Sequence, residues 1–379
     1  MTRRMWAWSA VALLMSVLGV TALYAQAKPE KIAPLEDIEV RAEPLASFVR
    51  EGGAALTLSD RLVWRGGLVL TSPSTYFGGW SGLLMDADGK GFLAVSDAGS
   101  WLKGELDYEA DRPVGVRAAR IGPLKSKNGK PLARKRDRDA EAITLAGGTM
   151  TEGRAYISFE RKTRIGLFDI EDGEVAAPTD YLDAPKGTRH LGNDGIEALT
   201  VLAGGRRKGT LVAFAEAPLR DDKHLTGWFW VAGKLQAFAV EDIGGFAITD
   251  AASLADGSVL ILERRFRWTE GLKVRLRLLP AASVAPGATA SGEILLAAEP
   301  SAAEIDNLEG LALSTGKDGE TVVTIISDDN FNHLLQRTLL LQFTLKPPAA
   351  EAAKEPEEKR DDGSSDAAAT VEDGKVAPR

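Results

Sequence analysis

Residues 197–216 read EALTVLAGGRRKGTLVAFAE: an acid, a short apolar run, a turn of glycines and arginines, a second apolar run and a second acid. Short runs rich in Val, Leu and Phe, separated by turn residues, are typical of β-strands. We therefore predict a β-hairpin in which one acidic residue precedes the first strand and another follows the second strand.

The same plan occurs five times. The other copies are SGLLMDADGKGFLAVSD (81–97), EAITLAGGTMTEGRAYISFE (141–160), DAASLADGSVLILE (250–263) and EGLALSTGKDGETVVTIISD (309–328). Successive copies begin 53 to 60 residues apart, close to the longer repeats of β-propellers, which limit exposed sheet edges by radial repetition. We predict an all-β fold, a single β-propeller. A β-sandwich is the other all-β option, but it does not predict so long a period.

The number of blades follows from the length of the folded region. About 300 residues divided by the repeat period lies between five and six, and we favour six blades, with five as the alternative. Residues 56–70 precede the first copy and residues 337–345 follow the last. Because a ring closes best when strands from both ends of the chain share a blade, we expect these two segments to do so.

The flanking acids should meet at one opening. In every copy the midpoint between the two flanking positions falls in the turn, so antiparallel pairing brings the flanks together. Nine carboxylates would then surround the opening, with Ser81 at the tenth position: Asp97, Glu141, Glu160, Glu197, Glu216, Asp250, Glu263, Glu309 and Asp328. Carboxylates so close together raise one another's pKa or bind a cation. The alternative is that they are strand-end residues facing water.

The two ends of the chain differ from the repeats. Residues 1–27 have a charged start at Arg3 and Arg4, an apolar stretch and an Ala-Gln-Ala site, as in a cleaved export signal. An uncleaved anchor is the alternative, and either the general or the twin-arginine route would fit. We expect a periplasmic or secreted protein that does not insert into a membrane after cleavage. Residues 347–379, rich in Ala, Glu, Asp and Pro, predict a disordered acidic tail. The propeller should span residues 45–346.

Composition excludes several classes of function. The 379 residues include no cysteine, which rules out disulfides, a thiolate nucleophile and cysteine-bound zinc. The net charge of −8 gives no support to nucleic-acid binding. The chain also has no nucleophile elbow, P-loop, dinucleotide-binding motif or zinc-protease motif.

Several stretches together resemble one known family. They are FGGWSGLLMDADGKGFLAVSDAGSW, DAEAIT, SFERKTRIGLF, NDGIEALT, LILERRFRW, DNLEGLAL and SDDNFNHLLQRTLLLQF, and they extend over most of the folded region. In these the chain resembles the phytase-like family, also described as "esterase-like activity of phytase". The resemblance implies an exported propeller that hydrolyses phosphate or other esters. It identifies no catalytic residue.

The residue types suit metal-assisted hydrolysis. Carboxylate oxygens hold hard cations and guanidinium groups bind phosphate with two hydrogen bonds. We predict a calcium site formed by Asp97, Glu141, Glu197, Glu309 and Asp328. The predicted substrate-binding residues are Arg161, Arg164, Arg264, Arg265, Arg337 and Asn330. The alternative for the arginines is that Glu–Arg pairs fasten neighbouring blades together.

The stretch SDDNFN, residues 327–332, places several carboxylates and amides at the end of an apolar strand. We predict catalytic roles for Asp329 and for two histidines near acidic repeat positions, His190 and His333. The alternatives are a loop whose Asx side chains cap their own backbone and histidines that are merely solvated.

Two functions remain open at this point. One is an exported hydrolase acting on a small phosphate or other ester. The other is a non-catalytic propeller that binds a ligand or partner on the same face, with a purely structural metal. The fold alone does not separate them.

Overall fold

The computed structural model describes residues 32–51, 56–182, 185, 195–216, 224–231 and 233–348. The predicted export signal, His190 and all but the first two residues of the predicted tail lie outside these ranges. The chain divides into two compact units, residues 1–346 and 347–379, and the first contains every described strand.

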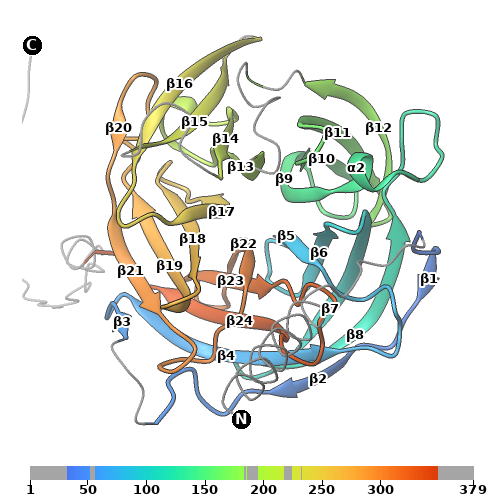
Figure 1. Ribbon diagram of the computed structural model, residues 1–379, viewed down its shortest axis with the longest axis horizontal. Helices are drawn as coiled ribbons and strands as arrows, with labels where there is room; N and C mark the ends of the chain where they lie inside the picture. Colours follow the sequence, from blue (N-terminus) through green and yellow to red (C-terminus); the bar gives the residue numbers. More distant parts are fainter. Residues whose placement is uncertain are drawn as a thin grey trace, which may run out of the picture. The chain divides into compact units, whose positions relative to one another are not determined.

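The described strands form five sheets around a central axis (Figure 1). Blade 1 contains β5 (Trp80–Met85), β6 (Gly91–Ser96), β7 (Ser100–Glu109) and β8 (Arg112–Pro123). Blade 2 contains β9 (Ala140–Gly148), β10 (Gly153–Phe159), β11 (Arg164–Glu171) and β12 (Glu174–Leu182). Blade 3 contains β13 (Ile196–Val201), β14 (Leu211–Ala215), β15 (His224–Val231) and β16 (Lys234–Glu241). Blade 4 contains β17 (Ala247–Ser253), β18 (Val259–Arg267), β19 (Gly271–Leu279) and β21 (Glu293–Ala298). Blade 5 contains β22 (Leu308–Thr315), β23 (Thr321–Ser327), β24 (Thr338–Leu345) and β4 (Leu62–Thr71).

The all-β propeller is confirmed, but the favoured number of six blades is wrong. Each of the five predicted hairpins supplies the two inner strands of one blade. The expected pairing of the chain ends is also found, because β4 runs antiparallel to β24. These two strands complete the fifth blade, so no strands are left among the described residues to build a sixth.

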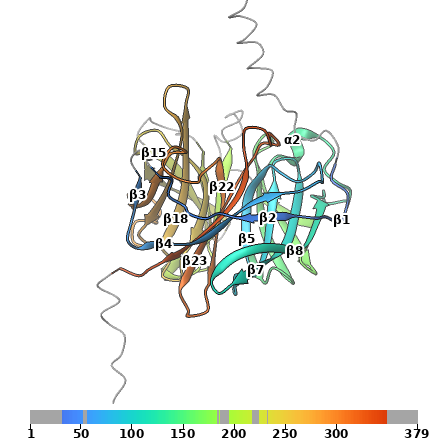
Figure 2. The same cartoon turned by 90° about the horizontal axis from the view of Figure 1, so that it is seen from below.

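Short strands cover the outer edges of four blades. β1 (Glu36–Asp37), β2 (Arg41–Pro44) and β3 (Thr57–Leu58) pair with the outer strands of blades 1, 5 and 4, and β20 (Thr289–Ala290) pairs with blade 3. Figure 2 shows β2 and β4 running across the outside of the ring, between the sides that carry β3 and β1. Such cover protects sheet edges from pairing with other chains. β1 and β2 precede residue 45, the expected start of the propeller.

The apolar core consists of five clusters, and each lies between two neighbouring blades. The cluster between blades 1 and 2, for example, joins Val95 and Trp101 to Ile157 and Phe168. The inner strands β5, β9, β13, β17 and β22 contact one another in sequence, and β22 contacts β5. Close packing between blades therefore fixes the positions of the hairpin ends.

The helical segments are short. α2 (Lys135–Arg138) precedes blade 2, and η2 (Gly205–Arg207) lies in the turn of the blade 3 hairpin. Within the described residues, no helix has the length and apolar character needed to cross a membrane.

Candidate metal and anion site

The first strand of each blade carries a β-bulge near its start. In blade 1, Trp80 pairs with Ser96 and Gly82 with Val95, which leaves Ser81 without an opposite residue. The same two-against-one arrangement occurs in blades 3, 4 and 5, and blade 2 has a register shift at the same place. The residues at this position are Ser81, Glu141, Glu197, Thr249 and Glu309.

The second strand of each blade supplies a matching position. In blade 2, for instance, the N–H of Glu160 donates to the carbonyl of Asp139 over 3.0 Å, just beyond the bulge. Blade 4 has Arg264 at this position, paired with Ala247. The five residues are Asp97, Glu160, Glu216, Arg264 and Asp328. We call these ten positions the mouth ring; they include seven carboxylates and one guanidinium group.

Two of the nine expected carboxylates do not belong to the mouth ring. The sequence pattern places Asp250 and Glu263 one residue away from the positions that Thr249 and Arg264 take in the true register. Asp250 instead accepts N–H bonds from Ala251 and from Leu311, over 2.8 and 2.7 Å, and so ties β17 to β22.

Glu263 lies in a fully buried ion network. Its carboxylate oxygens accept bonds from Arg275 Nε over 2.6 Å and from Arg277 Nη2 over 2.7 Å. The two arginines also donate to the carbonyls of Ile243 and Glu241. For Glu263 the structure therefore shows the alternative, a structural Glu–Arg pair. The pair lies within blade 4.

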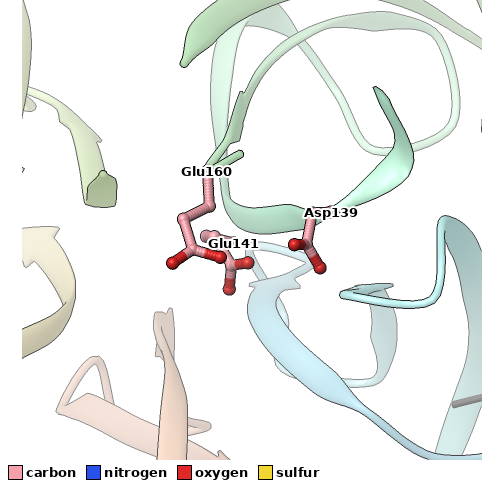
Figure 3. A group of neighbouring side chains, drawn as sticks. All are labelled: Asp139, Glu141 and Glu160. Atoms are coloured by element: carbon pink, nitrogen blue, oxygen red, sulfur yellow. The ribbon is translucent and has the colours of Figure 1, made fainter. Parts of the chain in front are cut away.

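Among the described residues, two groups of carboxylates could hold a metal ion. Asp139, Glu141 and Glu160 form the first, and Glu160, Glu197 and Glu216 form the second; in each group the oxygens lie within 4.8 Å of one another. The carboxyl groups of Glu141 and Glu160 point into the same space, with Asp139 beside them (Figure 3). Glu141 and Glu197 were predicted as ligands. Asp139 was not, because it ends a basic run, residues 125–139, that resembles an exposed loop.

Burial and mutual repulsion raise the pKa values of these acids. The pKa of Glu160 rises to about 8 because the group is partly buried and lies near Asp139 and Glu216. The pKa values of Glu141 and Glu197 are raised well above the usual range, first by burial and then by neighbouring carboxylates of the ring. Negative charge is therefore costly here unless a cation offsets it.

The other predicted ligands, Asp97, Glu309 and Asp328, face the same opening from blades 1 and 5. Burial, then Glu309 and Asp97, raise the pKa of Asp328 well above its usual range. Arg264 partly offsets this charge, since its Nη1 atom lies 3.3 Å from Glu309 Oε1 and its Nη2 atom 3.8 Å from Glu216 Oε1.

A cavity of about 750 Å³ lies beside the ring. Its lining includes Arg264, Arg337 and Asn330, three of the predicted substrate-binding residues, together with Arg50, which the sequence pattern did not reveal. Arg50 precedes the repeats, so no spacing argument could place it near the opening. Arg264 also donates to Asn307, another lining residue, over 2.6 Å. Arg264 thus belongs to both the mouth ring and the cavity.

The remaining arginines lie elsewhere. Arg161 pairs with Asp139, with Nε and Oδ2 2.5 Å apart, and so borders the first carboxylate group. Arg164 stacks on Phe159, 3.8 Å from the ring centroid, and donates to the carbonyl of Asp137. Arg265 pairs with Glu270 over 2.5 Å. The structure therefore brings Arg161 to the ring, whereas Arg164 and Arg265 make other contacts.

The SDDNFN loop is held by its own carboxylates. Asp328 Oδ1 accepts the N–H of Asn330 over 2.6 Å, and Asp329 Oδ1 accepts the N–H of Phe331 over 3.0 Å. Asn330 and Phe331 have φ angles of 49° and 54°, an uncommon backbone for a bulky residue such as Phe. The alternative interpretation, a loop whose Asx side chains cap their own backbone, thus holds for part of this loop.

Asp329 connects the loop to the rest of the mouth. Its Oδ1 atom also accepts the N–H of Gly79 over 3.2 Å, and its Oδ2 atom accepts the hydroxyl of Thr338 over 2.9 Å. The backbone comes so close that a Cβ at Gly78 would lie 2.6 Å from Asp329 Oδ1, hence the Gly-Gly pair at this point. His333 Nδ1 lies 3.0 Å from Asp329 Oδ2, and this contact raises the pKa of His333.

Comparisons with known proteins found one family and a solved structure. Residues 75–331, more than half of the chain, match the family described as "Phytase-like: Esterase-like activity of phytase". The chain belongs to this family. A solved structure described as "Structure of Dos1 propeller" is similar over 77% of this chain and 78% of its own, with 8% identity and a TM-score of 0.33. No curated protein matched.

The family match locates the site within this phytase-like chain. All ten mouth-ring positions fall inside residues 75–331, whereas Arg50 and Arg337 of the cavity fall outside. The carboxylate ring is therefore part of the matched domain, and the cavity combines that domain with residues from both sides of it.

Proposed function

We propose that this protein hydrolyses phosphate or other esters, with calcium held by carboxylates of the mouth ring. The observation that carries the proposal is the position of Arg264. Its guanidinium group contacts ring carboxylates and also lines the cavity with Arg50 and Arg337. A cation site and an anion site thus lie side by side, which is what metal-assisted ester hydrolysis requires.

The first carboxylate group fits a hard cation. Glu141 is only 7% exposed, and none of the described residues donates a hydrogen bond to it. A buried carboxylate without a donor is costly unless a cation or proton compensates it. The atoms available to bind a cation are all carboxylate oxygens, which suit calcium better than zinc or copper. A bound divalent cation would polarise the ester and lower the pKa of a water molecule.

The protein's own residues would orient the substrate. Arg264 and Arg337 can hold the anionic group with paired N–H donors, while the amides of Asn307 and Asn330 line the same cavity. His333, 60% exposed at its side chain and oriented by Asp329, can exchange a proton with the ester or its leaving group. Asp329 is then a positioning residue, because its oxygens are occupied by structural donors.

A panel of chromogenic esters tests the proposal. Chelator-treated protein is assayed with 4-nitrophenyl phosphate, bis(4-nitrophenyl) phosphate and 4-nitrophenyl acetate, before and after calcium is restored. We expect calcium-dependent turnover that Glu141→Gln and Glu160→Gln abolish. Glu293→Gln is the matched control, since Glu293 is a partly exposed acid paired with Arg61 on an outer strand. Turnover that is insensitive to calcium and to both ring variants would refute the proposal.

A ligand-binding propeller without catalysis is the second candidate. The saturation of Asp329 by backbone and hydroxyl donors favours it, because such a group is unsuited to act as a nucleophile or base. Under this alternative, calcium would stabilise the protein and no ester of the panel would be hydrolysed.

We also propose export to the periplasm or the outside of the cell, with a small-molecule ester as partner. The support is the signal-like composition of residues 1–27. Cell fractionation with N-terminal sequencing tests this: recovery outside the cytoplasm with a start at Lys28 is expected, and recovery from the cytoplasm with an intact Met1 would contradict it.

A further inference from the structure

The cavity beside the mouth ring is lined by side chains of two kinds. The first, which we call the polar wall, comprises Arg50, Arg264 and Arg337 with several amides. The second, which we call the apolar wall, comprises Phe266, Leu272, Ile305 and Leu335. A cavity of about 750 Å³ falls within the range of pockets that enclose small organic ligands.

The polar wall presents positive charge to the cavity. Arg50 and Arg337 share one carboxylate, Glu304, with contacts of 2.8 Å and 3.0 Å. Their side chains are 37% and 36% exposed, whereas that of Glu304 is 20% exposed. Glu304 and Glu309 do not line the cavity in the described part of the chain, and Asp306 is the one acid that does. The arginines are therefore more accessible than the acids that balance them.

The apolar wall is unusually open to water. Phe266 and Leu335 are 55% and 54% exposed. Trp268 packs against Phe266 with ring centroids 5.6 Å apart and an angle of 73°, which supports the Phe266 ring from the side. Ile305, which also lines the cavity, is only 2% exposed. Large apolar side chains exposed together at a cavity commonly mark a binding surface.

We propose that the cavity selects small amphiphilic anions: esters whose charged group contacts the arginines and whose aromatic or similarly sized apolar body packs on Phe266 and Leu335. This inference rests on the proposed function in placing the ester in this cavity. A polyphosphorylated polyol would match only one of the two walls and would leave Phe266 and Leu335 in water. A volume of about 750 Å³ suits a soluble small molecule as the occupant.

Binding of two phosphonates, which are not hydrolysed, tests the inference. Phenylphosphonate and methylphosphonate carry the same charged group and differ in the apolar body. Calorimetric titration of the full chain, with calcium and with chelator, should give about tenfold tighter binding of phenylphosphonate. Phe266→Ala and Leu335→Ala should reduce this preference to about twofold or less while methylphosphonate binds as before. Arg337→Met should weaken both ligands.

The controls separate the cavity from general effects. Leu235→Ala removes another partly exposed leucine, on β16 of blade 3, and should change neither affinity. Equal affinities of the unaltered protein for the two phosphonates, or a preference that survives both cavity variants, would overturn the inference. The inference would also be overturned if the protein bound anionic phospholipid vesicles, lost this binding on Phe266→Ala and showed no preference for phenylphosphonate. The apolar wall would then dock to a membrane.

The outcome also separates this inference from the proposed function. Selective phenylphosphonate binding without turnover of any ester would refute the proposed hydrolase activity and support the cavity's selectivity. Turnover of the ester panel without a phenyl preference would overturn only the selectivity.

Discussion

Glu160 shows how strongly its surroundings control a single side chain. It belongs to both carboxylate groups that could hold a metal, and burial with Asp139 and Glu216 nearby raises its pKa to about 8. A group with a raised pKa takes up a proton when the protein folds. It therefore favours folding at low pH and ceases to do so as the pH rises through its folded-state pKa.

The first prediction concerns pH. In chelator-treated protein, the melting temperature should fall as the pH rises from about 4.5, the usual value for Glu, to about 8. Calcium should remove most of this decline, because the cation replaces the proton as the compensating charge. Glu160→Gln should flatten the metal-free profile. A melting temperature that increases over this range in metal-free protein would show that the ring acids are not destabilising.

The second prediction concerns Asp329, whose carboxylate accepts bonds from Gly79, Phe331 and Thr338. Asp329→Asn turns one acceptor into a donor that faces other donors. It should lower the free energy of unfolding by about 2–4 kcal/mol, measured by urea denaturation. Asp318→Asn, in an exposed turn, should change it by no more than about 0.5 kcal/mol. If the two variants are equally stable, Asp329 does not hold the loop.

The sequence predicted residue types better than residue positions. Glu141, Glu197, Glu309, Asp97 and Asp328 occupy the mouth ring as expected from the repeat. In blade 4 the expectation fails by one residue, because acids at both flanks hid the true register. Asp139, two residues before Glu141, was missed because it ends the basic run 125–139. Arg50 reaches the cavity by packing between distant segments, which no local pattern encodes.

At the scale of elements, a buried ion network crosses the middle strands of blade 4. Glu263 on β18 faces Arg275 on β19 in the strand register, with Arg277 beside it. All three side chains are almost fully buried. A sequence cannot show which of two adjacent residues, Glu263 or Arg264, faces the strand partners and which faces the opening, because that depends on the bulge at Thr249.

The third prediction follows from this network. Glu263→Gln leaves two buried guanidinium groups without their counter-charge and should cost about 3–5 kcal/mol of stability. Glu293→Gln, on β21 of the same blade, removes an acid that is 49% exposed at its side chain and should cost no more than about 1 kcal/mol. Chemical denaturation of both variants provides the comparison. A similar small loss in both would mean that the buried network does not stabilise blade 4.

At the scale of the whole molecule, each of the five hairpins forms the inner half of one four-stranded blade, and β24 and β4 complete the fifth blade. The hairpin period and the pairing of the chain ends were both accessible from the sequence, because strand patterns and turns are local signals. The number of blades was not, because it depends on whether β4 and β24 join an existing sheet or begin a new one. β24 pairs with β23 and β4 pairs with β24, so the ring closes at five blades.

Closure at five blades brings seven carboxylates and Arg264 to one opening. Burial, and then ring acids from other blades, raise the pKa values of Glu141, Glu197 and Asp328, so repulsion between these acids opposes closure of the ring. A cation at the opening should therefore stabilise the entire fold and not one loop.

Calcium-dependent melting of chelator-treated protein tests this account most directly. At a calcium concentration a hundredfold above the dissociation constant, the gain should be about 2.7 kcal/mol, seen as a higher melting temperature. Magnesium should give less because it requires a tighter octahedral site. Glu141→Gln should lose most of the gain, and Glu293→Gln should keep it. A melting curve that saturating calcium leaves unmoved would contradict the account and show the mouth ring to be a hydrated acidic rim.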